Sequence, residues 1–321
     1  MAVYTRLEAA EVQALLDACG GGPLEGLEPI PEGIENTTYR VRAGGRRFVL
    51  TVFEREGPER VAAVLGAIAA LSRRGVPCPA PLDGPAGPLL WVRDKPAALS
   101  PFVEGRFVVA PTEAELEALG AALARFHLAG RDLVLAGGEG PHRAAVLAPL
   151  ARRLAGRVRG GDPDLADLLE QEAAHQERVP EEGLPWGLLH ADLFLDNVLF
   201  APDRLGVAAL LDFQMLGTGP WLYDLAVLLL DAGWKGQAVD GDLARALLRG
   251  YRALRPVEGQ EYAACRDYLR RAALRFLCLR LERFVVDATP MVAGRGKDPA
   301  ECAGKLRSLR RDHPNGRGKG L

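Results

Sequence analysis

The chain has 321 residues, a net charge of −2 and 48% apolar residues, which allows two modest domains with a core each. A nucleic-acid-binding protein needs a basic surface, so this charge argues against one. No apolar stretch is long enough to span a membrane, and the amphipathic, acidic N-terminus differs from a signal peptide. The five cysteines lie far apart, which predicts reduced thiols in the cytosol and argues against a disulfide framework or a structural zinc site.

The first hundred residues predict an antiparallel sheet accompanied by two helices. Apolar residues recur at helical spacing over 8–18 and 58–74. Extended segments are predicted from their apolar patterns at 38–41, 46–53, 89–93 and 97–102. The turn Ala43–Gly45 joins the first two of these segments into a hairpin.

Helical patterns dominate the rest of the chain. Thr112 and Glu115 form a capping-box pair in front of a long helix. Helices are predicted through residue 176 and again from 222 to about 310, with a short β segment at 190–213 between them. The sequence therefore predicts an α+β protein with two lobes, a small antiparallel-sheet lobe at 1–103 and a mainly helical lobe at 104–321.

The most informative segment begins at His190 and has the pattern His-x-Asp-x₄-Asn. It is followed by Asp212 at the end of a predicted strand. This is the catalytic-loop arrangement of kinases, in which a hairpin of strands brings an amide and a carboxylate together. Oxygen ligands of this kind, with nucleotide phosphates, are what Mg²⁺ prefers. Asn197 and Asp212 are therefore the predicted metal ligands, and ATP is the predicted phosphoryl donor.

Asp192 is the predicted catalytic residue. It precedes Asn197 by five positions on an extended loop, where its carboxylate is free to face an acceptor hydroxyl. It would orient this hydroxyl and accept its proton as the γ-phosphoryl group leaves ATP. We expect His190 to support the loop through a backbone hydrogen bond.

Two further segments predict contacts with the nucleotide. The turn containing Gly33, Asn36 and Thr37 precedes the first clear strand, where backbone and side-chain donors can contact phosphate oxygens. The segment Ser100–Val103 joins the two predicted lobes. Its backbone groups, including those of Ser100, Phe102 and Val103, are the predicted partners of adenine.

These motifs resemble the aminoglycoside-phosphotransferase branch of the protein-kinase-like superfamily, and within it the homoserine kinases. The resemblance runs nearly from end to end. The matching segments are the opening at 1–5, the Gly-Ile-Glu-Asn-Thr turn at 33–37, Gly75–Pro79, Phe126–Gly130, the catalytic loop, Trp221–Ala226 and the late Lys-Asp-Pro at 297–299. The resemblance implies Mg·ATP-dependent phosphorylation of the homoserine side-chain hydroxyl, a step in threonine biosynthesis. The resemblance also implies that Asp192 is the catalytic residue and that Asn197 and Asp212 hold Mg²⁺.

The sequence departs from related patterns at two positions. Thr51 stands where protein kinases carry the lysine that pairs with phosphates, although the homoserine-kinase pattern also tends to have Thr here. We assign Thr51 to the nucleotide site and leave Arg47 and Arg55 as candidate cations. After Asp212, the family usually has an acid before Trp-Leu-Tyr-Asp, and this chain has none, which leaves the acceptor open.

Other residues keep two interpretations. Asp224 either caps the helix that begins near Trp221 or supports the catalytic loop. Arg275 and Arg280 either bind the carboxylate of a zwitterionic substrate or form ion pairs between helices.

Three functions remain open from the sequence. The first is a homoserine kinase with a small-molecule substrate, no nucleic-acid or membrane partner and an undetermined oligomeric state. The second is a related kinase that acts on an aminoglycoside, choline or a methylated thiosugar, because the fold does not fix the acceptor. The third is a non-catalytic nucleotide-binding module. Intact Asp192, Asn197 and Asp212 argue against this last interpretation.

Overall fold

The computed structural model describes residues 4–31, 36–135, 140, 142–202, 206–283 and 298–311. The chain divides into two compact units. Unit 1 comprises Met1–Phe107, Leu135–Gly137 and Val198–Gln214. Unit 2 comprises Val108–Val134, Gly138–Asn197 and Met215–Leu321. Unit 1 therefore contains the segment that follows Asn197 as well as the N-terminal region.

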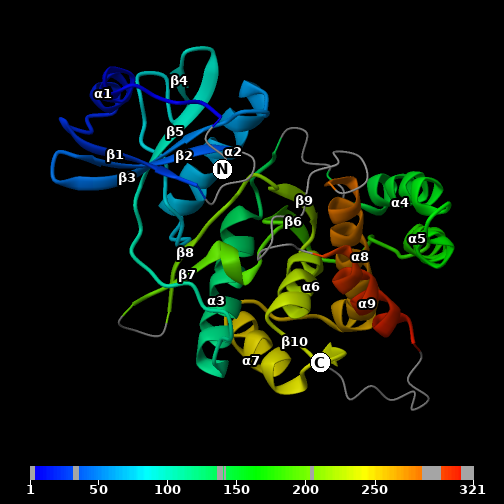
Figure 1. Cartoon of the computed structure of the whole chain (residues 1–321). Helices are drawn as coiled ribbons and strands as arrows, with labels where there is room; N and C mark the ends of the chain where they lie inside the picture. The colour runs from blue at the N-terminus through cyan, green and yellow to red at the C-terminus, as the bar shows by residue number, and fades with distance from the viewer. Residues whose placement is uncertain are drawn as a thin grey trace. The chain divides into compact units, whose positions relative to one another are not determined.

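Unit 1 is built on a five-stranded antiparallel sheet with the strand order β1-β2-β3-β5-β4 (Figure 1). The strands are β1 Leu24–Ile30, β2 Thr37–Ala43, β3 Arg46–Val52, β4 Leu90–Val92 and β5 Lys95–Pro101. Alternate residues of β2, among them Tyr39 and Val41, are buried because successive side chains point to opposite faces of a sheet. Gly44 and Gly45 connect β2 to β3 with φ of 53° and 69°, which glycine adopts at little cost. The predicted hairpin is confirmed.

Two helices pack on this sheet. They are α1 Ala9–Ala18 and α2 Pro58–Arg73. The α1 helix begins with a capping box between Glu8 and Glu11, and it buries Val12, Leu15 and Leu16 in the core that it shares with the sheet. The α2 helix has proline at its first position, where the missing N–H is not needed, and it packs along β5. Both helices were predicted from apolar spacing.

A second hairpin completes unit 1. Its strands are β7 Val198–Phe200 and β8 Val207–Leu210, and they pair antiparallel. Leu210 N–H donates to the Pro77 carbonyl at 2.7 Å, and Phe200 exchanges two backbone hydrogen bonds with Arg106. The hairpin is therefore attached to unit 1 by backbone hydrogen bonds, and it carries Asp212 at its far end.

The first long helix of unit 2, α3 Glu113–Gly130, packs against α7 Gly241–Arg252. The predicted capping box is present, since the Thr112 side chain accepts a hydrogen bond from Glu115 N–H. The two helices approach so closely that a Cβ on Gly120 would lie 2.0 Å from the Leu247 carbonyl oxygen, and one on Gly250 would lie 1.7 Å from that of Glu117. Only glycine permits this close crossing.

The remaining helices of unit 2 also pack in pairs. They are α4 Ala144–Val158, α5 Pro163–Gln176, α6 Leu222–Asp231, α8 Gly259–Leu281 and α9 Pro299–Arg310. In Figure 1, α4 and α5 lie side by side, and α8 lies next to α9. Every residue of α6 from Leu222 to Leu230 is buried, which places this helix in the centre of the unit. The predicted α+β class is confirmed.

Two features of unit 2 were not predicted. The strands β6 Trp186–Leu189 and β9 Gly217–Pro220 form an antiparallel pair directly before the catalytic loop and before α6. A short hairpin of β10 Trp234–Lys235 and β11 Ala238–Val239 interrupts the predicted helical region. The Gly-Thr-Gly-Pro sequence of β9 has little intrinsic strand propensity, so its pairing with β6 decides its conformation.

Two further expectations concern membranes and thiols. In the part of the chain that the structure describes, no helix is both long and apolar enough to cross a bilayer. The five cysteines are free thiols.

Candidate active site

The catalytic loop follows β6 in unit 2. Ala191 has a φ of 62°, a conformation that costs a residue other than glycine roughly 1 kcal/mol. The carboxylate of Asp224 on α6 stabilises this turn because it accepts hydrogen bonds from the N–H groups of His190 and Ala191, each at 2.8 Å. The half-buried Asp192 therefore extends from a backbone that a buried carboxylate holds in place.

Asn197 is fixed by the same loop. Its Nδ2 donates to the backbone carbonyl of Asp192 at 2.8 Å. The short 3₁₀ turn Leu195–Asn197 is anchored by Asp231, whose carboxylate accepts from Leu195 N–H at 2.7 Å. Because the amide nitrogen is used inside the loop, the Oδ1 of Asn197 is the atom that remains to meet a cation.

A buried chain of hydrogen bonds continues from Asp224 away from the loop. His127 Nε2 lies 3.1 Å from the Asp224 carboxylate, and His127 Nδ1 lies 2.7 Å from the Tyr251 hydroxyl. Arg255 donates to that hydroxyl at 3.2 Å and forms two hydrogen bonds of 2.8 Å with Glu261. We call these five residues the buried relay. Its members lie on α6, α3, α7, α8 and the segment between α7 and α8.

The pKa values indicate the direction of each hydrogen bond in the relay. Burial lowers the pKa of His127, so its imidazole is neutral and its Nε2–H donates to Asp224. Its Nδ1 then accepts from Tyr251, whose oxygen accepts from Arg255. Burial alone would raise the pKa of Asp224, but hydrogen bonds from His127 and from His190 N–H outweigh it and lower that pKa. Asp224 is therefore an ionised carboxylate that supports the loop.

This arrangement decides between the two interpretations of Asp224, because the carboxylate binds the catalytic loop. His127 was not predicted as part of the site. Its signals were a histidine at the end of an apolar helix, directly after Phe126, and its place in the family-matching segment Phe126–Gly130. Trp221 stacks on the His127 ring with centroids 5.3 Å apart, so it belongs to the support of the relay.

In unit 1, Asp212 follows β8 with a φ of 58° and an exposed side chain. Two residues further, the carbonyl of Gln214 accepts a hydrogen bond from Arg60 Nη2 at 3.0 Å. Arg60 lies in the first turn of α2, and burial lowers the pKa of its guanidinium. Sequence reasoning missed Arg60, which binds the backbone two residues after Asp212.

The predicted phosphate-covering turn is described only in part. Gly33 lies outside the described residues. The Thr37 hydroxyl is fully buried and donates to Glu54 at 2.6 Å while it accepts from the N–H groups of Tyr4 and Thr5. Asn36 Oδ1 accepts from Glu54 N–H, and its buried Nδ2 has no protein partner. Of these two side chains, Asn36 is therefore the one with a donor available for phosphate.

The other predicted nucleotide contacts lie on β3 and β5. Thr51 is half-buried and pairs across the sheet with Thr38 and Ala98. Ser100 pairs with Val49.

The segment after Ser100 has few free backbone donors. Pro101 has no N–H, and Phe102 N–H donates to the Arg47 carbonyl. Among the described residues, Val103 N–H makes no backbone hydrogen bond and is the available donor for adenine.

The two arginines considered as carboxylate partners differ. Arg280 donates to the Glu301 carboxylate at 3.0 Å and to the Asp298 carbonyl at 2.7 Å, which joins α8 to α9. Arg275 is 2% exposed, and its Nε and Nη1 are buried without a hydrogen-bond partner. Arg280 thus forms an ion pair between helices, whereas Arg275 lies over the Phe276 ring, 4.9 Å from its centroid, and forms no ion pair within the described part of the protein.

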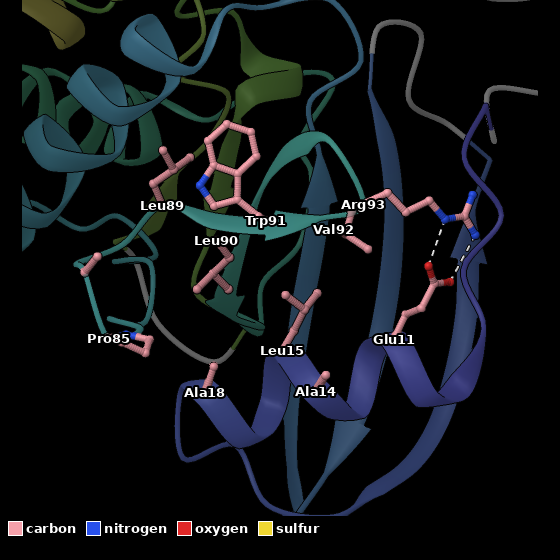
Figure 2. A pocket seen from close by; sticks show the side chains of 11 residues that line it. Glu11, Ala14, Leu15, Ala18, Pro85, Leu89, Leu90, Trp91, Val92 and Arg93 are labelled. Atoms are coloured by element: carbon pink, nitrogen blue, oxygen red, sulfur yellow. Dashed lines mark hydrogen bonds and ion pairs between the residues drawn. The ribbon is translucent and has the colours of Figure 1, made fainter.

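A pocket of about 410 Å³ lies in unit 1 between α1 and β4. Figure 2 shows Leu15 of α1 pointing toward Leu90 and Val92 of β4, and Glu11 paired with Arg93 at the edge of the pocket. None of the predicted catalytic, metal or nucleotide residues lines it. The pocket is therefore separate from the catalytic loop and carries no part of the proposed chemistry.

The predicted metal ligands provide oxygen atoms, which suits a hard cation such as Mg²⁺. Nowhere in the described ranges do three or more His, Cys, Asp or Glu side chains gather in a way that could hold a metal. The side chains alone therefore do not form a complete coordination shell.

Comparison with known proteins identifies the family. A family model described as "Phosphotransferase enzyme family" matches residues 26–257. A homoserine kinase of Nitrobacter winogradskyi is 38% identical, with 97% of this chain and 95% of that protein aligned. A homoserine kinase of Xanthobacter autotrophicus is 36% identical, with 96% of this chain and 95% of that protein aligned.

Solved structures support the fold. An amicoumacin kinase in complex with AMP-PNP and Ca²⁺ has a TM-score of 0.67 at 17% identity, with 94% of this chain and 92% of that chain covered. A putative aminoglycoside phosphotransferase from Ralstonia eutropha has a TM-score of 0.65 at 19% identity, with 95% and 96% covered. The chain therefore belongs to the phosphotransferase enzyme family, and within it to the homoserine kinases of protein-kinase-like fold.

Proposed function

We propose that this protein is a homoserine kinase that transfers the γ-phosphoryl group of ATP to the side-chain hydroxyl of homoserine. The products are O-phosphohomoserine and ADP, which places the reaction in threonine biosynthesis. The observation that carries the proposal is the identity of 36–38% to proteins named homoserine kinase, over more than nine-tenths of both chains. The geometry of the catalytic loop supports the same class of reaction.

Asp192 is the proposed catalytic residue. Its carboxylate hydrogen-bonds the acceptor hydroxyl, orients one oxygen lone pair toward the γ-phosphorus and takes the proton. A bond forms between this oxygen and phosphorus as the bond to the β,γ-bridging oxygen breaks, and ADP leaves. Asp224 holds the backbone N–H groups of His190 and Ala191 throughout, so the position of Asp192 is set before the substrate binds.

Asn197 and Asp212 are the proposed protein ligands of Mg²⁺. Asn197 presents Oδ1 because its Nδ2 is bound to the Asp192 carbonyl. The cation, when bound, neutralises negative charge on the phosphates and on the departing ADP. The amicoumacin kinase of similar fold was solved with a nucleotide analogue and Ca²⁺, which supports a divalent cation at such sites.

Unit 1 carries the proposed nucleotide contacts. Val103 N–H is available for adenine, and the Asn36 amide is available for a phosphate oxygen. Gly33, Thr37, Thr51, Ser100 and Phe102 remain proposed neighbours of ATP. For Thr37 and Phe102, the hydrogen-bonding groups described above are already used within the protein, so we expect these residues to shape the site.

One assay tests the function. Purified protein is incubated with Mg·ATP and separately with homoserine, threonine, serine, choline or kanamycin, and ADP release is followed. We expect turnover with homoserine at least about 100-fold above that with choline or kanamycin, because a polar pocket rejects analogues that leave its groups unpaired. The margin over serine and threonine is expected to be at least about 10-fold, because these amino acids place their hydroxyl one methylene closer to the α-carbon. Turnover with choline or kanamycin but not with homoserine would show that the acceptor is a different alcohol. Binding of the nucleotide without turnover of any alcohol would show that the protein is a nucleotide-binding module without kinase activity.

A further inference from the structure

The guanidinium of Arg275 is the least satisfied charge that the structure describes on α8. It is 2% exposed, and both Nε and Nη1 are buried without a hydrogen-bond partner. Its neighbours on the helix differ, since Arg270 binds Glu172, Arg271 binds Glu181 and Arg280 binds Glu301. The guanidinium lies over the Phe276 ring, 4.9 Å from its centroid, but has no anionic partner among the described residues. A buried charge without an anionic partner is strongly unfavourable, so Arg275 indicates an anion that the described residues do not supply.

Arg275 lies close to the catalytic loop within unit 2. The ring of Phe276, the next residue, packs edge-on against Phe194 with centroids 4.6 Å apart. Phe194 is two positions after Asp192. The helix α8 also packs against α6, whose first turn contains Tyr223 and Asp224. The unpaired guanidinium is therefore near the residue that faces the acceptor hydroxyl.

A second unsatisfied donor lies in the same region. The hydroxyl of Tyr223 is buried without a hydrogen-bond partner, and the residue is 1% exposed. Burial raises the pKa of this hydroxyl, and among the nearby charges Arg275 opposes the rise while Asp224 and Asp192 add to it. The three charges thus all act on one hydroxyl, which therefore stays protonated and can donate.

We propose that Arg275 and Tyr223 bind the α-carboxylate of homoserine, an inference that rests on the proposed function. The guanidinium offers a planar pair of N–H donors that matches the two oxygens of a carboxylate. The Tyr223 hydroxyl supplies a further donor. Homoserine carries one carboxylate, and fixing it at α8 sets the distance at which its hydroxyl meets Asp192.

A phosphate of the nucleotide would suit the same donors, so the test separates the two anions. The substrate analogue 3-aminopropan-1-ol is homoserine without its carboxylate. For Arg275→Gln, kcat/KM for homoserine is expected to fall at least about 100-fold, and that for 3-aminopropan-1-ol to change less than about threefold. The KM for ATP is expected to stay the same. A rise in the KM for ATP with an unchanged preference for homoserine would assign the anion to the nucleotide and overturn the proposal.

Arg280→Gln is the matched control, because it removes a charge of α8 that binds Glu301. It is expected to keep the wild-type ratio of kcat/KM for the two alcohols. Arg275→Lys retains the charge without the planar pair of donors, and it is expected to fall between wild type and Arg275→Gln.

Folding is checked with Arg275→Met, which fills the same space without a charge. Its Tm is expected to equal or exceed that of the wild type, because an unpaired buried charge has been removed. A lower Tm together with an unchanged substrate ratio would make Arg275 a structural residue and overturn the proposal. If the wild-type protein does not phosphorylate homoserine, the proposed function fails and the ligand named here fails with it. If the wild type phosphorylates homoserine and the Arg275 variants keep the wild-type preference for homoserine, the function stands and this assignment falls.

Discussion

The carboxylate of Asp224 accepts a hydrogen bond from His127 Nε2 at 3.1 Å, and both side chains are fully buried. The two residues are 97 positions apart, on α6 and α3. Because the same carboxylate also binds the N–H groups of His190 and Ala191, the packing of two helices fixes the backbone next to Asp192, the proposed catalytic residue. Support for the reaction therefore comes from the helical core of unit 2.

The variant Asp224→Asn tests this support. An asparagine offers one oxygen to three donors and turns an NH₂ group toward one of them. We expect kcat to fall at least about 100-fold and the free energy of unfolding to fall by about 3 kcal/mol, since buried donors lose their acceptor. Steady-state kinetics and urea unfolding measure the two effects. The control is Asp240→Asn, a half-buried helix cap of α7, where Asn caps as well as Asp does.

Equal kinetics in Asp224→Asn and wild type would show that the loop does not need this carboxylate. A loss of stability without a loss of kcat would assign the relay to folding alone.

The elements that carry the site were predictable because their signals are local. The capping box of Thr112 and Glu115 lies within four residues, and the Gly44–Gly45 turn is defined by its own φ angles. The pattern from His190 to Asn197 is likewise local, because it is recognised from the spacing of residues within one loop. Local patterns of this kind are the part of a fold that a single sequence contains most directly.

The contacts that complete the site join residues far apart in the sequence. A single sequence does not show which distant residues will be in contact. The strand β9 has the sequence Gly-Thr-Gly-Pro and becomes a strand only by pairing with β6. Gly187 in β6 leaves room for Trp221, because a Cβ there would lie 2.7 Å from its Nε1. Arg275 and Arg280 look equivalent in the sequence, and only the position of Glu301 separates their roles.

The variant Asp192→Asn tests the proposed catalytic residue. Asparagine keeps the size of the side chain but does not accept the proton of the acceptor hydroxyl. We expect kcat to fall about 10³-fold while the Kd for ATP changes less than twofold, because general-base catalysis contributes a factor of roughly 10²–10⁴. Calorimetry with AMP-PNP measures the binding. The control is Asp196→Asn, the same change at an exposed position of the same loop, for which wild-type kcat is expected. Near-wild-type turnover in Asp192→Asn would show that Asp192 does not accept the proton of the acceptor hydroxyl.

Arg60 is expected to supply the positive charge that pairs with the nucleotide phosphates. Thr51, which stands where protein kinases carry a lysine, has no charge to supply. The earlier candidates are less suitable, since Arg47 binds Glu104 and lies over the Phe102 ring, and Arg55 is exposed. Arg60 is bound to the Gln214 carbonyl, two residues after Asp212. Arg60→Gln is expected to raise the KM for ATP about 10-fold or more, with a smaller rise in Arg60→Lys.

The control for Arg60 is Arg55→Gln, which makes the same change five positions earlier at an exposed residue and is expected to leave the KM for ATP unchanged. An unaltered KM in Arg60→Gln would show that its charge serves only the Gln214 carbonyl.

Metal removal tests the proposed ligands. Chelation with EDTA is expected to abolish turnover, and Mg²⁺ in excess over ATP is expected to restore it. Asn197→Ala and Asp212→Asn are each expected to raise the Mg²⁺ concentration for half-maximal rate about 10-fold or more, since each removes or weakens one oxygen ligand. Full activity in EDTA, or an unchanged Mg²⁺ requirement in both variants, would exclude these residues as ligands.

The stability of the protein is expected to fall on mild acidification because two buried histidines must remain neutral. Burial lowers the pKa of His142 from 6.5 to about 4, and the nearby charges of Arg275 and Arg143 act in the same direction while Asp224 opposes them. Burial also lowers the pKa of His127. Below pH 6.5 the unfolded chain takes up protons that the folded protein does not, so the stability that is complete above that pH is lost as the pH falls toward these lower values.

For His142 the loss between pH 7 and pH 5 is about 2 kcal/mol, because each unit of pKa difference corresponds to about 1.4 kcal/mol. Urea unfolding at the two pH values measures it. His142→Gln keeps a donor for the Thr218 carbonyl, which His142 Nε2 contacts at 2.9 Å, but has no group that titrates in this range. The variant is expected to lose correspondingly less stability between pH 7 and pH 5, with the remaining slope due to His127. An identical pH dependence in His142→Gln and wild type would contradict the link between this buried imidazole and acid sensitivity.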